Sequence, residues 1–251
     1  MKEKEQETCM IGEGIELHIK GIRVVWDKIE EDSYLRDIDS IAGIEQLEFH
    51  KPITFFVGEN GSGKSTLLEA IAVAYGFNPE GGTRNYSFST YDSHSELCNA
   101  MTVIKGYNKA GWGYFLRAES FYNVATADDA YGHEWGGVSH GYHEQSHGES
   151  FLAIAQDQFK PNGVYLLDEP EAALSPQRQL TLLLDIARCV KEDSQFIIVT
   201  HSPILLGIPD AEILSFDSGE IHPIEYEDTD SYKITEMFIN SREQILKRFL
   251  R

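Results

Sequence analysis

Apolar residues gather along this chain in two kinds of segment: short continuous runs and longer stripes with helical spacing. The short runs at 53–57, 164–167 and 196–199 predict buried strands, because a strand covered on both faces presents no polar side. Stripes that begin near residues 66, 149 and 176 predict amphipathic helices, the last of them opened by a proline. Strands that alternate with helices predict an α/β fold, with a mainly parallel central sheet covered by helices on both faces.

Weaker patterns flank this core and predict an additional antiparallel β region. Alternating, β-rich segments occur at 15–26 and 44–50. A pair at 101–105 and 113–117 is interpreted as one hairpin, and a pair at 212–216 and 220–224 as another. A final helix is expected from about Tyr232.

The length of 251 residues and the apolar content of 41% allow a sizeable core. We expect a single domain over 1–251, because no low-complexity linker or internal repeat divides the chain. Its expected parts are an N-terminal β region at about 11–50, a core at about 51–206 and a C-terminal hairpin and helix at about 207–251.

A glycine-rich loop joins the first buried strand to the first helix. Residues 58–65 match G-x-x-x-x-G-K-[ST], the phosphate-binding loop called Walker A. Strand, loop and helix in that order bring backbone N–H groups and a helix N-terminus to one point, where a triphosphate would sit. The residues predicted to hold it are Gly58, Glu59, Asn60, Gly61, Ser62, Gly63, Lys64, Ser65 and Thr66.

Polar side chains follow the other two buried strands. Asp168 ends the second strand and is placed to hold Mg²⁺ through water. Glu169 comes one residue later and is a candidate to polarise an attacking water. The third strand runs into His201, whose imidazole is a candidate to hydrogen-bond a terminal phosphate.

The order of these segments resembles that of the ATP-binding cassette (ABC) ATPases over about residues 50–205. Gln-Ser-His-Gly-Glu at 145–149 keeps the serine and second glycine of the Leu-Ser-Gly-Gly-Gln signature as Ser146 and Gly148. Ala-Ala-Leu-Ser at 172–175 resembles the D-loop of that family. The sequence around the phosphate loop and the acid pair is most similar to that of stand-alone ABC-type ATPases. These proteins are nearer to the RecF and SMC proteins than to transporter subunits.

This resemblance implies a P-loop NTPase fold and a mechanism with ATP and Mg²⁺. Two copies would face head to tail and close over two ATP molecules, as a homodimer with composite sites. Lys64 and the loop backbone would hold the β- and γ-phosphates, while Ser65 and Asp168 would order Mg²⁺. Glu169 would activate water, and His201 would sense the phosphate. Ser146 and Gly148 of the other copy would contact the γ-phosphate.

Charge limits the partners that we expect. The formal net charge is −20, and Lys160 is the only lysine or arginine between residues 118 and 177. Broad direct binding of nucleic acid is therefore not expected. A small basic group does occur at the C-terminus, where a solvated helix end is the favoured interpretation over a local basic patch. Its members are Arg242, Lys247, Arg248 and Arg251.

The chain carries no sign of a membrane or secretory address. No apolar run approaches the roughly 18 residues of a membrane span. The first seven residues are mostly charged and lack the apolar core of a signal peptide. Cys9, Cys98 and Cys189 are scattered and match no metal or disulfide pattern. We expect a cytoplasmic protein without a transmembrane segment.

Three functions compete on this sequence. The first is a dimerising ATPase that drives conformational change in an unknown partner protein. The second is the ATP-binding subunit of an ABC membrane transporter, which the lack of a clear helical subdomain disfavours. The third is a nucleotide-dependent scaffold with little turnover, which the pair of Asp168 and Glu169 disfavours.

Several positions keep two interpretations. Glu119 stands about where the family has its Q-loop glutamine, or is a surface residue. Trp26 and Tyr34 are candidates to stack on adenine, with packing as the favoured role of each. Four histidines before the signature either bind a metal ion or, as we favour, belong to a loop near the nucleotide. They are His133, His140, His143 and His147.

Overall fold

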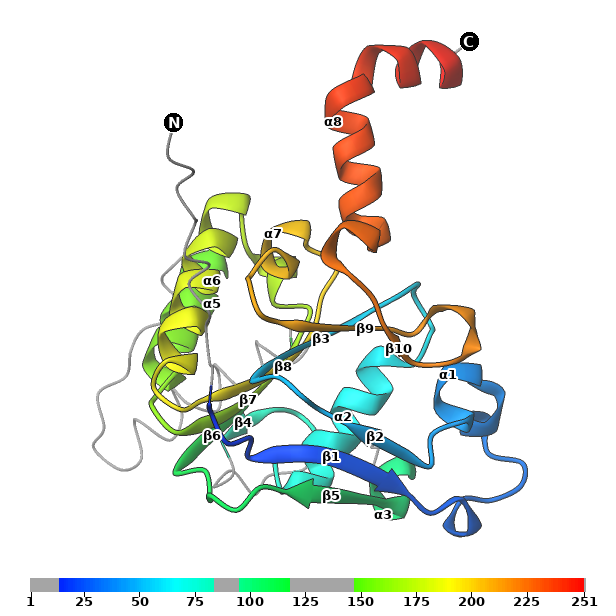
Figure 1. Cartoon of the computed structure of the whole chain (residues 1–251), viewed down its shortest axis with the longest axis vertical. Helices are drawn as coiled ribbons and strands as arrows, with labels where there is room; N and C mark the ends of the chain where they lie inside the picture. Colours follow the sequence, from blue (N-terminus) through cyan, green and yellow to red (C-terminus); the bar gives the residue numbers. More distant parts are fainter. Residues whose placement is uncertain (1–13, 84–94, 118–146, 251) are drawn as a thin grey trace, which may run out of the picture.

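The computed structural model describes residues 14–83, 95–117 and 147–250, and within them two sheets form a layered α/β fold (Figure 1). The larger sheet has the strand order β10-β9-β3-β8-β7-β6-β4. These strands are β10 (His222–Pro223), β9 (Glu212–Ser215), β3 (Ile53–Val57), β8 (Gln195–Val199), β7 (Gly163–Asp168), β6 (Trp112–Arg117) and β4 (Gly82–Thr83). The smaller sheet consists of β2 (Gln46–Glu48), β1 (Ile19–Val24) and β5 (Met101–Lys105).

The larger sheet is mainly parallel, as predicted. Strands β9, β3, β8, β7 and β6 run in one direction, while β10 and β4 pair antiparallel at the two edges. Every residue of β3, β7 and β8 is buried. The three continuous apolar runs are therefore the middle of the sheet, where helices cover both faces.

Helices cover the larger sheet on two sides. One face packs against α2 (Lys64–Tyr75), which lies between the two sheets with α3 (Leu97–Ala100) beside it. The opposite face is covered by α5 (His147–Gln158) and α6 (Pro176–Val190). The remaining helices are α1 (Asp39–Ala42), α7 (Pro203–Leu206) and α8 (Asp230–Phe249). Short 3₁₀ turns are η1 (Trp26–Lys28), η2 (Tyr34–Asp37), η4 (Pro170–Ala173), η5 (Asp217–Gly219) and η6 (Tyr226–Asp228).

The smaller sheet is antiparallel, as predicted, but the hairpin proposed for 101–105 and 113–117 is wrong. Both segments are strands, yet β5 pairs with β1 in the smaller sheet while β6 pairs with β7 and β4 in the larger. Gly113 lets β6 lie close to its neighbours, because a Cβ there would lie 2.9 Å from the Val164 carbonyl oxygen and 2.8 Å from the Phe77 ring. The hairpin at the C-terminal end is confirmed, since β9 and β10 pair antiparallel.

One buried amide joins the two sheets. Gln195, at the start of β8, donates from Nε2 to the Ile19 carbonyl at 2.8 Å and accepts from the Ile19 N–H at 2.8 Å. Both residues are fully buried. The side chain thus continues the hydrogen bonding of β1 where a register shift interrupts its ladder between Ile19 and Gly21.

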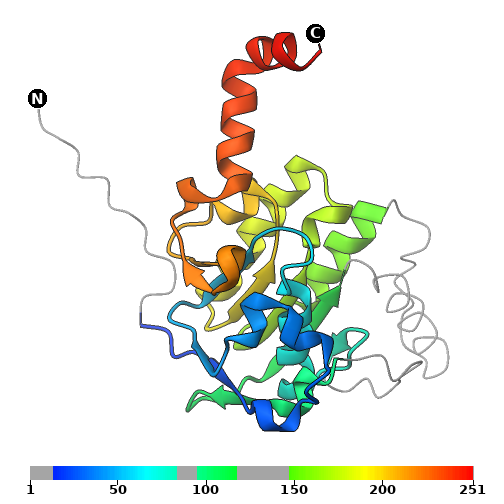
Figure 2. The ribbon, with the colours of Figure 1, turned by 90° about the vertical axis from the view of Figure 1, so that its right-hand side faces the viewer.

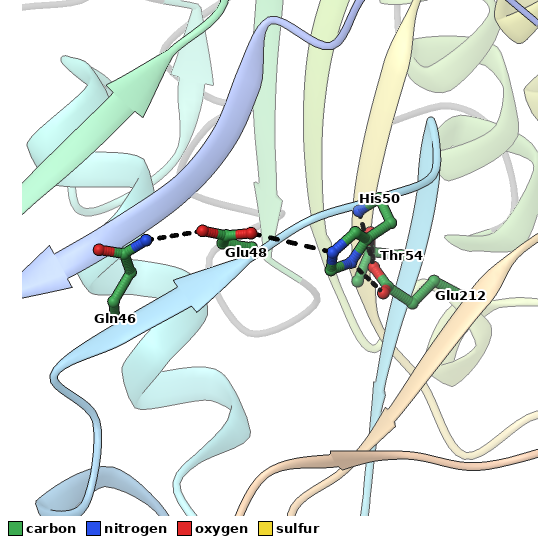
Figure 3. Close-up of polar contacts among 5 residues, drawn as sticks. All are labelled: Gln46, Glu48, His50, Thr54 and Glu212. Atoms are coloured by element: carbon green, nitrogen blue, oxygen red, sulfur yellow. Dashed lines mark hydrogen bonds and ion pairs between the residues drawn. The ribbon is translucent and has the colours of Figure 1, made fainter.

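A second link between the sheets lies at the surface (Figure 3). Nδ1 of His50 lies 2.9 Å from Oε1 of Glu212, and the same carboxylate accepts from the Thr54 hydroxyl at 3.4 Å. Glu48 accepts from Gln46 at 2.7 Å and lies 4.0 Å from the other nitrogen of His50. These side chains connect β2 with β3 and β9, but the pairs are mostly exposed and contribute little to stability.

The last helix stands away from the rest of the molecule (Figure 2). Its N-terminus is fixed by the buried Thr229, whose hydroxyl accepts from the Tyr232 N–H at 3.3 Å. None of the described helices is both long enough and apolar enough to cross a membrane.

Replacing the amide that joins the sheets is expected to destabilise the fold. Gln195→Leu keeps much of the side-chain volume but leaves the buried N–H and C=O of Ile19 without partners, which costs about 2–4 kcal/mol of unfolding free energy. Urea unfolding followed by circular dichroism measures the change. The matched control is Gln46→Leu on the exposed strand β2, for which we expect a change within about 0.5 kcal/mol. Equal stability of the two variants would contradict the role of Gln195.

Candidate functional site

The glycine-rich loop at 58–63 connects the end of β3 to the start of α2. Gly58 and Gly63 have φ angles of 142° and 91°, which side chains rarely adopt. A Cβ on Gly63 would lie 2.7–2.9 Å from atoms of Ile38 and Ile41. The loop is therefore held against the segment that contains α1. The Ser40 hydroxyl donates to the Ser62 carbonyl at 2.5 Å and fixes the same contact.

Lys64 is buried at the first position of α2, with 4% of its surface exposed. Its ammonium donates to the carbonyls of Gly58 at 2.8 Å and Glu59 at 2.6 Å. Burial lowers the pKa of Lys64, while the carboxylates of Asp217, Glu169 and Asp168 oppose that shift. The ammonium thus lies inside the curve of the loop, where it can bind an anion that enters the loop. Three carboxylates lie near it and help to keep it charged.

Ser65 and Asp168 come together from different elements. The Ser65 hydroxyl, in the first turn of α2, donates to Oδ1 of Asp168 at 2.8 Å. Asp168 ends β7 and is 9% exposed. Nε of Arg117 lies 3.8 Å from its second oxygen, and Arg117 also pairs with Glu69 of α2 at 2.6 Å. A hydroxyl and a carboxylate are oxygen ligands of the kind that Mg²⁺ prefers, so this pair fits the predicted ion.

Glu169 occupies an uncommon backbone conformation directly after β7. Its φ and ψ of 49° and 52° are left-handed, which costs a residue with a side chain. The Glu169 N–H donates to the Val199 carbonyl at 3.0 Å, which joins the ends of β7 and β8. Strained positions of this kind cluster at active sites and ligand-binding sites. The turn also leaves the carboxylate partly exposed beside the buried Asp168.

His201 is fixed through its backbone, while its ring keeps a free nitrogen. Its N–H donates to Oε1 of Glu171 at 2.6 Å, so the turn after β7 holds the turn after β8. Among the described residues, no group hydrogen-bonds the buried Nε2 of His201. A buried nitrogen without a partner is costly, and a phosphate oxygen would satisfy it.

His201 and the start of the loop line one open cleft of about 730 Å³. Its other walls come from η5, β10 and the first turn of α8, with Asp217, His222 and Ile234 among the lining residues. The cleft places the loop, the histidine and the last helix around one space. Gly148 is the second residue of α5.

Asp217 is a residue of the site that the sequence analysis missed. Its Oδ1 accepts from the N–H of Glu59 at 2.9 Å, and its Oδ2 accepts from the Ser215 hydroxyl at 3.3 Å. It follows β9, the neighbour of β3 in the sheet, so its position depends on a strand order that the sequence did not reveal. Of the nearby carboxylates, that of Asp217 raises the pKa of Lys64 the most.

The residues with two interpretations have different outcomes. Trp26 donates from its indole nitrogen to the Ile44 carbonyl at 2.8 Å and lies under the Arg36 guanidinium, which favours packing. Tyr34 is 55% exposed and does not line the cleft. Ser146, Glu119 and the histidines at 133, 140 and 143 lie outside the described residues. Within the described residues, no three acidic, histidine or cysteine side chains form a metal-binding group.

Two segments of the chain match families of AAA domains. Residues 16–111 match one described as an AAA domain, and residues 142–207 match one described as "AAA domain, putative AbiEii toxin, Type IV TA system". The first segment contains the glycine-rich loop, and the second contains Asp168, Glu169 and His201. Both parts of the candidate site thus lie in segments that are similar to AAA domains.

Solved structures with a similar arrangement share little sequence with this chain. The SMC head domain from Thermotoga maritima is 15% identical over 83% of this chain and 100% of its own, with a TM-score of 0.44. An ATP-binding cassette of an ABC transporter is 15% identical over 90% and 97%, also at 0.44. An SMC head bound to the C-winged helix domain of ScpA is 14% identical over 82% and 97%, at 0.46. Because these TM-scores are below 0.5, we draw no functional conclusion from these structures. No curated protein matches the chain.

Substitutions of Asp217 are expected to separate its hydrogen bond from its charge. Asp217→Asn keeps an acceptor for the Glu59 N–H and removes a negative charge near the loop, so we expect ATP to bind about three- to tenfold more tightly. Asp217→Ala loses the acceptor as well, so its affinity is expected to fall below that of the Asn variant. Titration of a fluorescent ATP analogue measures both, with the exposed Asp193→Asn as control. Identical affinities for the Asn and Ala variants would contradict the anchoring role.

Proposed function

We propose that the chain binds ATP with Mg²⁺ at the loop of residues 58–65 and hydrolyses it between two copies that close head to tail. Closure and release would drive conformational change in a partner protein. The observation that carries this proposal is the 2.8 Å hydrogen bond between Ser65 and Asp168, beside the buried Lys64. It brings a hydroxyl, a carboxylate and a cation to one end of the phosphate loop.

Each residue of the site has a role in this proposal. Lys64 and the N–H groups of the loop hold the β- and γ-phosphates, and their positive charge offsets the negative charge of the triphosphate. Ser65 and Asp168 would hold Mg²⁺, Asp168 through water, and Mg²⁺ would supply positive charge beside the phosphates. Nε2 of His201, which no described residue hydrogen-bonds, is available to a γ-phosphate oxygen.

Glu169 is the proposed residue that orients the attacking water. Glu169 follows Asp168 directly in a left-handed turn, which supports a role for its carboxylate that differs from metal binding. The two acids thus have different surroundings, as their different roles require. This arrangement favours turnover over a scaffold that only binds ATP. Ser146 and Gly148 of the second copy complete the site in the proposal, since closure assembles catalytic groups.

Removing the charge of Glu169 is expected to stop turnover while ATP stays bound. In Glu169→Gln, the amide cannot accept a proton from water, so we expect ATP hydrolysis to fall at least about 100-fold. Mg-ATP is expected to remain on the protein after gel filtration, together with a larger mass than without nucleotide. Glu192→Gln, an exposed change before β8, is the matched control. A variant that hydrolyses ATP normally, or gains no mass with Mg-ATP, would refute the proposed mechanism.

Removing the buried cation is expected to abolish binding itself. Lys64→Ala removes the positive charge inside the loop, and we expect ATP affinity to fall at least about 100-fold, as measured by isothermal titration. Lys51→Ala, an exposed lysine before β3, serves as control and should bind as the unchanged protein does. EDTA should lower hydrolysis of the unchanged protein to background, because phosphate charge would then lack its counter-ion. Normal turnover in Lys64→Ala would exclude the loop as the ATP site.

A further inference from the structure

The arginine at the end of β6 lies between two carboxylates beside the phosphate loop. Nη1 of Arg117 lies 2.6 Å from Oε2 of Glu69, and its Nε lies 3.8 Å from Oδ2 of Asp168. The Arg117, Glu69 and Asp168 side chains are only 21%, 14% and 12% exposed. Solvent screens charges at such positions weakly, so their arrangement affects any ion that binds beside them.

Two strands and one helix bring these charges together. β6 and β7 are parallel neighbours, and the last residues of the two strands, Arg117 and Asp168, stand opposite one another. Glu69 lies on α2 four residues after Ser65, and residues four apart lie on the same face of a helix. From that face, α2 presents a hydroxyl to Asp168 and a carboxylate to Arg117. The register of the sheet and the position of α2 therefore fix all four side chains in one group.

The two contacts of Arg117 differ in kind. Nη1 donates a charge-assisted hydrogen bond to Glu69, and it also donates to the Pro79 carbonyl at 3.5 Å. The contact of Nε with Asp168 is an ion pair, but its 3.8 Å are too long for a hydrogen bond. Nε is buried, and no group in the described part of the chain hydrogen-bonds it. Arg117 is therefore held by Glu69, with one unused donor near Asp168.

Asp168 is the residue that this unused donor would affect. Its Oδ1 already accepts from the Ser65 hydroxyl at 2.8 Å. A hydrogen bond from Nε of Arg117 to Oδ2 would bring a positive charge directly against the carboxylate. A cation bonded to a carboxylate opposes the binding of a second cation there. The separation of Nε from Oδ2 thus leaves the Asp168 carboxylate available to a metal ion.

We propose that Glu69 holds Arg117 away from Asp168, and that this restraint sets how strongly ATP binding at the loop depends on Mg²⁺. Glu69 and Arg117 are positioning residues in this proposal, because both act through Asp168. Without nucleotide, the charge of Arg117 reduces the repulsion between the two carboxylates. The inference rests on the proposed function, which assigns Asp168 to Mg²⁺.

Releasing the arginine is expected to reduce the dependence on Mg²⁺. In Glu69→Gln, the neutral amide holds Arg117 less strongly, so Nε closes on Asp168 and its unused donor is satisfied. The measured quantity is the affinity for a fluorescent ATP analogue in excess Mg²⁺ divided by the affinity in EDTA. We expect this ratio to fall about tenfold, because the guanidinium then opposes the metal ion. A ratio that is unchanged or higher would overturn the proposal.

Removing the arginine as well is expected to reverse that defect. The double variant of Glu69→Gln and Arg117→Met has no cation that can bond to Asp168, so its ratio should return at least to that of the unchanged protein. It also leaves no unpaired charge at either position, so it is expected to fold. A pair with a merely structural role predicts the opposite, since the double variant would lose both ends of a buried contact. A double variant with a ratio no higher than that of Glu69→Gln would refute the restraint.

An exposed ion pair provides matched controls. Lys20 and Glu16 lie 3.5 Å apart, and their side chains are 50% and 35% exposed. Lys20→Met, Glu16→Gln and their double variant make the same charge changes away from the loop. Their ratios should stay within about twofold of that of the unchanged protein, because exposed charges are screened. Shifts as large as those at Glu69 would assign the effect to the overall charge of the chain and contradict the proposal.

The restraint can also be observed without nucleotide or metal. A crystal structure of Glu69→Gln grown with EDTA should show Nε of Arg117 at about 3 Å from Oδ2 of Asp168. In urea unfolding, Arg117→Met should lower the midpoint more than Glu69→Gln does. The first variant leaves the carboxylate of Glu69 without a cation, whereas in the second the guanidinium still has Asp168. A structure in which Nε stays at 3.8 Å or beyond would show that Glu69 does not hold the arginine away.

This inference and the proposed function can be told apart when they fail. If the unchanged protein binds no ATP, the proposed function is wrong, and the role of Arg117 in metal dependence is wrong with it. If the unchanged protein binds ATP and all Glu69 and Arg117 variants share its dependence on Mg²⁺, only the role of these two residues is wrong. A ratio that falls in Glu69→Gln and recovers in the double variant supports both.

Discussion

The hydrogen bond between Ser65 and Asp168 depends on the register of the parallel strands in the central sheet. Ser65 belongs to the helix after β3, and Asp168 ends β7, with β8 between the two strands. Phe56 and Asp168 both stand opposite Val199 of β8, so the three parallel strands end at the same level. The loop, the acid pair and the histidine turn therefore meet at one edge of the sheet. A shift of one strand by a single residue would separate them.

The layers around the sheet make that register stable. The continuous apolar side chains of β3, β7 and β8 are covered by α2 on one face and by α5 and α6 on the other. The smaller sheet covers α2 from outside, and Gln195 fixes the two sheets together through paired hydrogen bonds to Ile19. The phosphate loop is thus supported on several sides, with α1 against Gly63 and Asp217 against Glu59.

Charge is concentrated at this supported loop in an otherwise acidic molecule. Lys64 is buried there, with its ammonium bonded to loop carbonyls and three carboxylates near it. Binding of a triphosphate would exchange some of these neutral and acidic partners for phosphate oxygens. At the other end of the molecule, the basic last turn of α8 projects away from the acidic body. The two positive sites thus lie apart, one inside the fold and one on its projecting helix.

The sequence by itself determined the buried strands and the longer helices, because apolar periodicity reports burial on one or both faces of an element. It predicted the buried strands, the loop at 58–65 and the helix that starts at Pro176. It also placed the acid pair and His201 at strand ends. Only the tertiary structure decided which strands are neighbours. The segments 101–105 and 113–117 are strands of different sheets, which the sequence could not show because β-rich composition does not specify a partner strand.

The contact of Asp217 with the loop and that of Gln195 with Ile19 join residues 158 and 176 positions apart. Contacts at that distance arise from packing of whole layers, and no local pattern encodes them.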